Sequence, residues 1–126
     1  MSFNPLKHEI ANNNIEVIQV EEYSHLGRLD ISGNNIKFFS DIKVPSTIRH
    51  LVLSHNQLEN LDGIEQLTEL KTLDISYNNL DEKDLKNLAD LTNIVFVDAK
   101  GNPDMSTDMI YKLDQFSAPY LRSIKQ

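Results

Sequence analysis

Aliphatic and polar residues alternate in short segments that recur along this chain. The clearest segment is Leu70–Leu80, which has the form L-x-x-L-x-L-x-x-N-x-L. Its centre, Leu73-Asp74-Ile75, has the period of two that is typical of a β-strand with one buried face. The pattern predicts a strand whose aliphatic side chains point into a core. The side chains between them point to solvent, and Asn78 marks the end of the strand.

The same form recurs at Ile48–Leu58 and Leu26–Ile36, and more loosely at Ile94–Pro103. The four copies are marked by asparagines separated by 22, 22 and 24 residues, namely Asn34, Asn56, Asn78 and Asn102. With this nearly constant spacing and the shared L-x-x-L-x-L-x-x-N-x-L form, the segments resemble leucine-rich repeats. A buried amide side chain needs hydrogen-bond partners, so we expect the four asparagines to stack as a buried polar ladder.

The stretches between these strands predict the opposite side of a solenoid. The β-branched residues of Ile15–Val20 favour an extended path. Leu61, Ile64 and Leu67 are spaced by three, which suits a short 3₁₀ or helical turn. Leucines recur by three again in Asp81–Leu91, which predicts a helical turn with Asp81 as its N-cap. The aromatic and aliphatic residues between 37 and 47 are expected to fill the core; these are Phe38, Phe39, Ile42 and Val44.

The length of 126 residues fits one domain. Residues 1–25 are interpreted as an amino-terminal cap with a degenerate repeat, in which Asn13 takes the ladder position. Residues 26–103 hold four repeats, and residues 104–126 form a carboxy-terminal cap. The apolar residues of 106–116 have helical spacing and predict a helix over the open end of the last repeat. Because one repeat cannot bury its apolar face alone, neighbours must stack and the ends must be covered.

The repeat period and the tail together resemble one class of leucine-rich repeat proteins. The 22-residue period with aliphatic return segments is similar to the protein-phosphatase-regulator class. The tail, with Gly101-Asn102-Pro103, then Tyr111, then Pro119-Tyr120-Leu121, resembles the carboxy-terminal cap found in that class. The resemblance implies an α/β fold: a right-handed solenoid with a parallel sheet on its concave face, short helical or extended segments on its convex face, and a helical cap.

Composition narrows the class of function. Hydrophobic residues make up 40% and charged residues 25%, as in a globular protein, and no apolar run reaches the roughly 20 residues of a membrane span. The net charge of −7 argues against nucleic acid as the main partner. The chain has no cysteine and no N-glycosylation sequon. We therefore expect an intracellular protein, cytoplasmic or nuclear, that is a monomer on its own and contacts no membrane.

Candidate binding residues are those that face outward from the sheet. The register predicts one row containing Lys7, Arg28, His50, Thr72 and Phe96, and a next row containing Glu9, Asp30, Val52, Asp74 and Asp98. A further row follows the strands and contains Asn12, Gly33, His55, Tyr77 and Gly101. The predicted partner-binding set is Arg28, Asp30, His50, Val52, His55, Thr72, Asp74, Tyr77, Phe96 and Asp98. Exposed aromatic residues with flanking charges are typical of binding hot spots. An exposed Phe96 calls for a partner or for cover by the carboxy-terminal segment.

We expect a non-enzymatic module that binds a protein or peptide with a basic or mixed surface on its concave face. An alternative is a structural subunit that works through its convex face or edge, for which Phe38 and Phe39 are the indication. A metal site at His50, His55 and Asp74 is a weaker third hypothesis, because zinc sites need three or four ligands. No catalytic residue, metal or cofactor is predicted, since the sequence has no cysteine nucleophile, G-x-S-x-G motif or P-loop.

Overall fold

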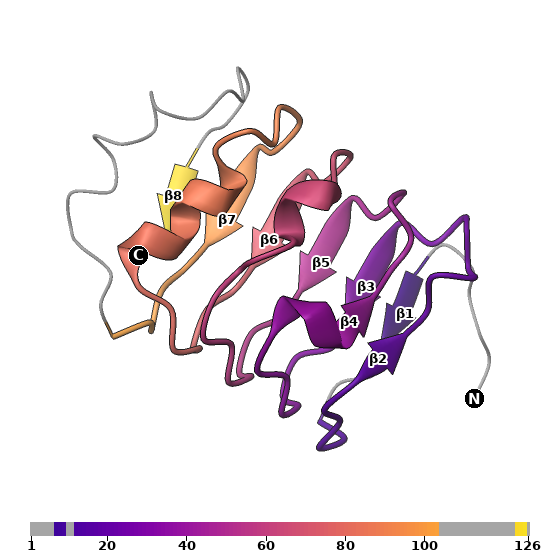
Figure 1. The fold of residues 1–126 in the computed structure, drawn as a ribbon, viewed down its shortest axis with the longest axis horizontal. Helices are drawn as coiled ribbons and strands as arrows, with labels where there is room; N and C mark the ends of the chain where they lie inside the picture. Colours follow the sequence, from indigo (N-terminus) through magenta and orange to yellow (C-terminus); the bar gives the residue numbers. More distant parts are fainter. Residues whose placement is uncertain (1–6, 10–11, 104–122, 126) are drawn as a thin grey trace.

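The computed structural model describes residues 7–9, 12–103 and 123–125. Six short parallel strands form one sheet in the order β1-β3-β5-β6-β7-β8 (Figure 1). Their bounds are β1 Lys7–Glu9, β3 Arg28–Asp30, β5 His50–Val52, β6 Thr72–Asp74, β7 Phe96–Asp98 and β8 Ser123–Lys125. Successive strands of this sheet are neighbours, and the described segments between them return along the opposite side. The α/β right-handed solenoid with its parallel sheet on the concave face is confirmed.

The convex side changes character along the molecule. Two extended segments pair there as a small parallel sheet, β2 (Ile18–Gln19) and β4 (Ile42–Lys43). The remaining segments are 3₁₀ turns, η1 (Phe39–Asp41), η2 (Ile64–Gln66) and η3 (Glu82–Leu88). The predictions of an extended first return segment and of helical turns in the later ones are confirmed. Among the described residues, no helix is long and apolar enough to cross a lipid bilayer.

The start of η3 is fixed by the N-cap that the sequence predicts. Asp81 Oδ1 accepts a hydrogen bond from the Lys83 N–H at 2.9 Å, and Asp84 Oδ2 accepts one from the Asp81 N–H at 3.0 Å. These reciprocal bonds form a capping box, which satisfies donors that the first helical turn leaves unpaired. The leucines of η3 can then face the core, and Leu85 and Leu88 are buried.

The strand register agrees with the sequence patterning. Arg28 lies beside His50, His50 beside Thr72, and Thr72 beside Phe96. The residues two positions later pair in the same way, from Asp30 through Val52 and Asp74 to Asp98. Both predicted rows therefore exist as straight lines across the sheet.

Aliphatic side chains of all the described repeats fill one continuous core between the sheet and the return segments. Leucine and isoleucine side chains such as Leu51, Leu73 and Ile75 are almost completely buried. The prediction that Phe38 fills the core is wrong. Phe39 is buried at 6% exposure, but Phe38 remains 39% exposed, because η1 begins directly after it and turns its side chain away from the core.

The asparagine ladder is present and bonded throughout. Asn78 Oδ1 accepts the Leu58 N–H of the preceding repeat at 3.0 Å, and Asn78 Nδ2 donates to Leu53 O at 3.0 Å and Ile75 O at 3.1 Å. Equivalent bonds join the other ladder residues, Asn34, Asn56 and Asn102, to backbone groups of their own repeat and of the preceding one. Each amide thus satisfies buried backbone groups that the turns leave open.

The ends of the solenoid differ from expectation or lie outside the described residues. Asn13 was expected in the ladder, but its side chain is exposed; its backbone N–H donates to Asn34 Oδ1 at 3.0 Å. The helix predicted over 106–116, like most of the carboxy-terminal cap, lies outside the described residues. Strand β8, which continues the sheet beside β7, was not predicted.

The ladder gives a stability prediction. Substitution Asn78→Ala removes an acceptor and two donors, and leaves the Leu58 N–H buried without its partner. We expect a loss of about 2–4 kcal/mol in the free energy of unfolding, measured by urea denaturation. The control is Asn79→Ala, because the neighbouring Asn79 side chain is exposed. It is expected to change stability by less than about 0.5 kcal/mol. Equal losses in the two variants would contradict the ladder's role.

Candidate functional site

The first outward row runs across the sheet near the start of each strand. Arg28 is exposed, whereas His50, Thr72 and Phe96 are partly buried. His50 Nδ1 lies 2.7 Å from Thr72 Oγ1, which holds the imidazole against its neighbour. Phe96 is bordered on its other side by β8, whose Ser123 is its register partner. Along this row a cation, an oriented imidazole, a hydroxyl group and an aromatic ring therefore follow one another.

Positive charge gathers around His50. Partial burial lowers the pKa of His50 below its usual value of 6.5, and the nearby charges of Arg28, Lys71 and Arg49 lower it further. Both effects favour the neutral imidazole, because burial penalises the charged form and like charges repel it. At neutral pH this end of the strands is therefore basic through its arginines and lysine, while His50 is a neutral hydrogen-bonding group.

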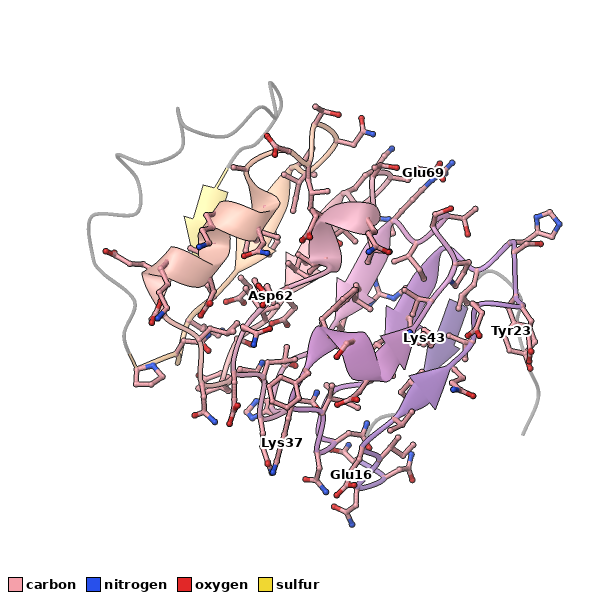
Figure 2. All side chains as sticks on the ribbon, in the orientation of Figure 1. Glu16, Tyr23, Lys37, Lys43, Asp62 and Glu69 are labelled. Carbon is pink, nitrogen blue, oxygen red and sulfur yellow. The ribbon has the colours of Figure 1, made fainter. Side chains whose placement is uncertain are left out.

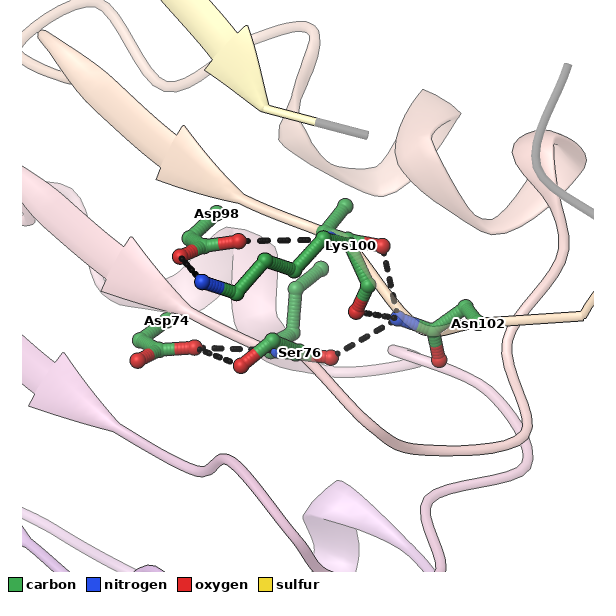
Figure 3. A network of polar contacts seen from close by, with 7 residues as sticks. Asp74, Ser76, Asp98, Lys100 and Asn102 are labelled. Carbon is green, nitrogen blue, oxygen red and sulfur yellow. Dashed lines mark hydrogen bonds and ion pairs between the residues drawn. The ribbon is translucent and has the colours of Figure 1, made fainter. Parts of the chain in front are cut away.

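The second outward row carries fixed carboxylates. Asp74 Oδ1 accepts hydrogen bonds from the Ser76 N–H at 3.0 Å and the Ser76 hydroxyl at 2.6 Å (Figure 3). Asp30 makes the same pair of bonds with Ser32 at 3.0 and 2.7 Å. One oxygen of each carboxylate is thus engaged. The other has no hydrogen-bond partner among the described residues and can accept a bond from a partner molecule.

Asp98 is the least accessible of the predicted binding residues. It is 8% exposed, its Oδ1 accepts the Lys100 N–H at 3.2 Å, and its Oδ2 lies 3.8 Å from Lys100 Nζ (Figure 3). Lys100 occupies the position that serine holds in the three preceding repeats. The acidic row is therefore partly neutralised at Asp98, whereas Asp30 and Asp74 each keep one carboxylate oxygen free of hydrogen bonds with the described residues.

The row after the strands has an unusual backbone. Every residue in it has a positive φ: 62° at Asn12, 69° at Gly33, 56° at His55, 56° at Tyr77 and 75° at Gly101. This left-handed conformation is easy for glycine but costs other L-residues roughly 1–2 kcal/mol each. At the last four of these positions the following asparagine lies buried in the ladder. A tyrosine and a histidine thus occupy positions at which the backbone favours glycine.

These two rings form an exposed stack. The centroids of His55 and Tyr77 lie 4.5 Å apart with an interplanar angle of 10°, and Tyr77 is 46% exposed. The Tyr77 ring also covers Gly101, where an added Cβ would overlap the ring. The side-chain gain from stacking offsets part of the backbone cost. The two rings thus form an exposed aromatic pair at positions where the backbone favours glycine.

All ten predicted residues lie in these three rows. Nine of them have exposed or partly exposed side chains, whereas Asp98 is buried. Sequence reasoning missed the contribution of Lys71 and Arg49 to the charge around His50, since these residues lie outside the strand pattern. It also missed that serines pin the carboxylates. The spacing D-x-S in Asp30-Ile31-Ser32 and Asp74-Ile75-Ser76 was the available signal.

The three rows present polar and aromatic groups in a fixed order across the sheet. Within the part of the chain that the structure describes, no three histidine, aspartate or glutamate side chains gather as metal ligands. The rows instead order the charge, with cations near the strand starts, carboxylates near the strand ends and aromatic rings beyond them. Such a graded, rigid surface is typical of interfaces in which polar groups fix orientation and aromatic groups contribute affinity.

Comparison with known proteins agrees with the repeat pattern. A family model for leucine-rich repeats, in two copies, matches residues 46–93. The chain is 31% identical over 135 aligned positions to the mouse PH domain leucine-rich repeat-containing protein phosphatase 1, an alignment that covers 94% of this chain. It is 40% identical over 57 residues to Receptor-like protein 49 of Arabidopsis thaliana, covering 44% of this chain. The chain spans only 7% of the length of each of these relatives.

Solved structures show the same fold. A chain of the Drosophila melanogaster SNF/U2A′ complex superposes with a TM-score of 0.80 at 20% identity, covering 94% of this chain and 71% of that one. An internalin from Listeria monocytogenes superposes with a TM-score of 0.67 at 19% identity, covering 88% of this chain and 32% of that one. At these identities the likeness concerns the solenoid alone.

The environment of His50 gives a titration prediction. In an NMR titration we expect the His50 pKa below 6.5, and we expect Arg28→Gln to raise it only part of the way, because burial is the larger cause. Lys86→Gln, on the convex η3, is the control and should leave the pKa unchanged. Because the native state then holds fewer protons than the unfolded state, His50 should reduce stability as the pH falls from 6.5 to its own pKa. A wild-type pKa at or above 6.5 would refute this.

The left-handed backbone at Tyr77 gives a second prediction. Tyr77→Gly and Tyr77→Ala both remove the ring, but only alanine keeps the steric cost of the positive φ. We expect the glycine variant to be more stable than the alanine variant by about 1 kcal/mol in urea unfolding. At Thr72, inside β6, the order should reverse, with alanine more stable than glycine. If alanine were more stable than glycine at Tyr77 as well, the φ of Tyr77 would carry no strain.

Proposed function

Because this chain is a leucine-rich repeat protein, we propose that it is a non-enzymatic module that binds a partner protein or peptide on its concave face. Leucine-rich repeats in general serve interaction, and their function lies in the residues displayed on the scaffold. The observation that carries the proposal is the stack of His55 and Tyr77 on left-handed backbone, beside the fixed carboxylate of Asp74.

The proposed contact surface consists of the three outward rows. It contains Arg28, Asp30, His50, Val52, His55, Thr72, Asp74, Tyr77, Phe96 and Asp98. Rigidity supports the proposal, since strand residues and pinned carboxylates lose little freedom when a partner binds. The partner is expected to present a basic or mixed surface, because Asp30 and Asp74 each retain one oxygen without a partner in the described structure, whereas Asp98 is already paired with Lys100. We further propose that a monomer of this chain meets the partner inside the cell, as the cysteine-free composition favours.

A second candidate function is that of a subunit held in a larger assembly through the convex side. Phe38 is 39% exposed and Val17 is 56% exposed, and both line an open depression of about 220 Å³. The superposed U2A′ protein was itself solved in a complex with SNF. Phe39 is buried and cannot contact a partner, so of the two phenylalanines only Phe38 still supports this second function.

A partner-capture experiment distinguishes binding on the concave face from binding on the convex side. Tyr77→Gly/Phe96→Ala removes two aromatic side chains from the concave face, and glycine avoids an added backbone cost at Tyr77. Val17→Ala/Phe38→Ala is the matched pair on the convex side. We expect partner recovery from a native extract to fall at least about tenfold with the concave pair only, as for hot-spot residues. Thermal unfolding of both variants verifies that they are folded. Loss with the convex pair alone would favour the assembly subunit.

A further inference from the structure

The convex side contains a strand with one open edge. β4 pairs in parallel with β2, through Ile18 with Ile42 and Gln19 with Lys43. In the next repeat the corresponding segment is the 3₁₀ turn η2, so within the described structure β4 has no strand on that side (Figure 1). The sequence explains the change. Ile42 and Val44 alternate with a period of two, whereas Leu61, Ile64 and Leu67 recur by three.

The backbone of β4 leaves hydrogen-bonding groups at this edge. In a parallel ladder each residue directs its N–H and C=O to the same neighbour, and successive residues alternate. The Lys43 C=O accepts the Val20 N–H at 2.7 Å, so Lys43 faces β2. Ile42 and Val44 therefore face the open edge. The Ile42 N–H is used by η1, where it donates to Phe39 O, whereas the Val44 N–H has no partner among the described residues.

A groove lies along the same edge. It has a volume of about 270 Å³, and apolar residues of both flanking segments line it, including Phe39, Val44 and Leu67. Its size suits one or two side chains of a chain segment and lies below the range of about 300–1,000 Å³ that is usual for small-molecule sites. Two carboxylates and one ammonium group, of Glu21, Asp62 and Lys43, lie along it (Figure 2 labels Lys43 and Asp62).

We propose that the open edge of β4 receives an extended segment of a partner protein as a third strand. A backbone carbonyl of the segment accepts the Val44 N–H, and a backbone N–H donates to the Ile42 C=O. An apolar side chain of the segment enters the groove between Phe39 and Leu67. This mode of recognition takes its affinity from main-chain hydrogen bonds and its specificity from alternate side chains.

Charge selects the kind of segment. The groove has one net negative charge from Glu21, Asp62 and Lys43, and the whole chain carries −7. A segment in which apolar and basic residues alternate places its apolar residues in the groove and its basic residues near the carboxylates. A second copy of this chain is a poorer occupant, because two molecules of charge −7 repel each other. The site is separate from the concave surface and does not depend on the function proposed above.

The probe for the test is a short capped peptide of alternating valine and lysine. Amide hydrogen exchange of the ¹⁵N-labelled protein, followed by NMR, reports each backbone N–H. We expect saturating peptide to slow exchange of the Val44 amide by at least about tenfold, because the amide gains a bond. The Val20 amide is the internal control, since it already donates to Lys43, and it should change little.

Two further comparisons make the test specific. A peptide of the same charge with proline in place of its central valines has no N–H to donate to the Ile42 C=O at those positions, so it should bind more weakly and protect the Val44 amide much less. The variant Glu21→Lys/Asp62→Lys, which alters only exposed side chains, should weaken binding of the lysine peptide several-fold. The concave variant Tyr77→Gly/Phe96→Ala should bind the peptide like wild type. An unprotected Val44 amide at millimolar peptide, or equal protection by the proline peptide, would overturn the proposal.

Discussion

The buried asparagine ladder is the interaction on which the rest of this structure depends. A solenoid turns its chain sharply after every strand, and each turn leaves backbone N–H and C=O groups inside the molecule. The amides of Asn56, Asn78 and Asn102 satisfy these groups within their own repeat and in the repeat before. An unpaired buried polar group costs about 1–3 kcal/mol. The turns can therefore be buried because the repeats stack at the register that brings each asparagine to these groups.

The ladder also shapes the candidate binding surface. The residue before each inward-pointing asparagine takes a left-handed backbone conformation, and these residues form the column from Gly33 to Gly101. Glycine meets the requirement without strain at two of these four positions. At His55 and Tyr77 the chain instead places stacked rings there. The element that holds the repeats together thus also fixes the place and direction of the most exposed aromatic groups on the face.

The two sides of the solenoid obey different constraints. On the concave side every strand has the same length and register, so its charges form straight rows. On the convex side the return segments are free to differ, and they change from strand to 3₁₀ turn between β4 and η2. A uniform array would leave no open edge at this point. The change creates one, together with the groove beside it, because strands and 3₁₀ turns cannot share a hydrogen-bond ladder.

The sequence by itself determined the repeat, the strand register and the ladder, because these follow from which residue types recur at fixed spacing. The positions of Leu73 and Asn78 hold an aliphatic residue and an asparagine in all four of these repeats, so local pattern and tertiary contact agree. Tertiary structure alone decided that Phe38 turns outward, that Asp98 is buried against Lys100, that His55 stacks on Tyr77 and that β8 extends the sheet. The His55–Tyr77 stack and the pairing of β8 with β7 join different repeats, whereas Phe38 and Asp98 depend on how their own turn and strand end fold. In each case the side-chain direction or pairing is set by the surrounding backbone and side chains and not by the residue's own place in the period.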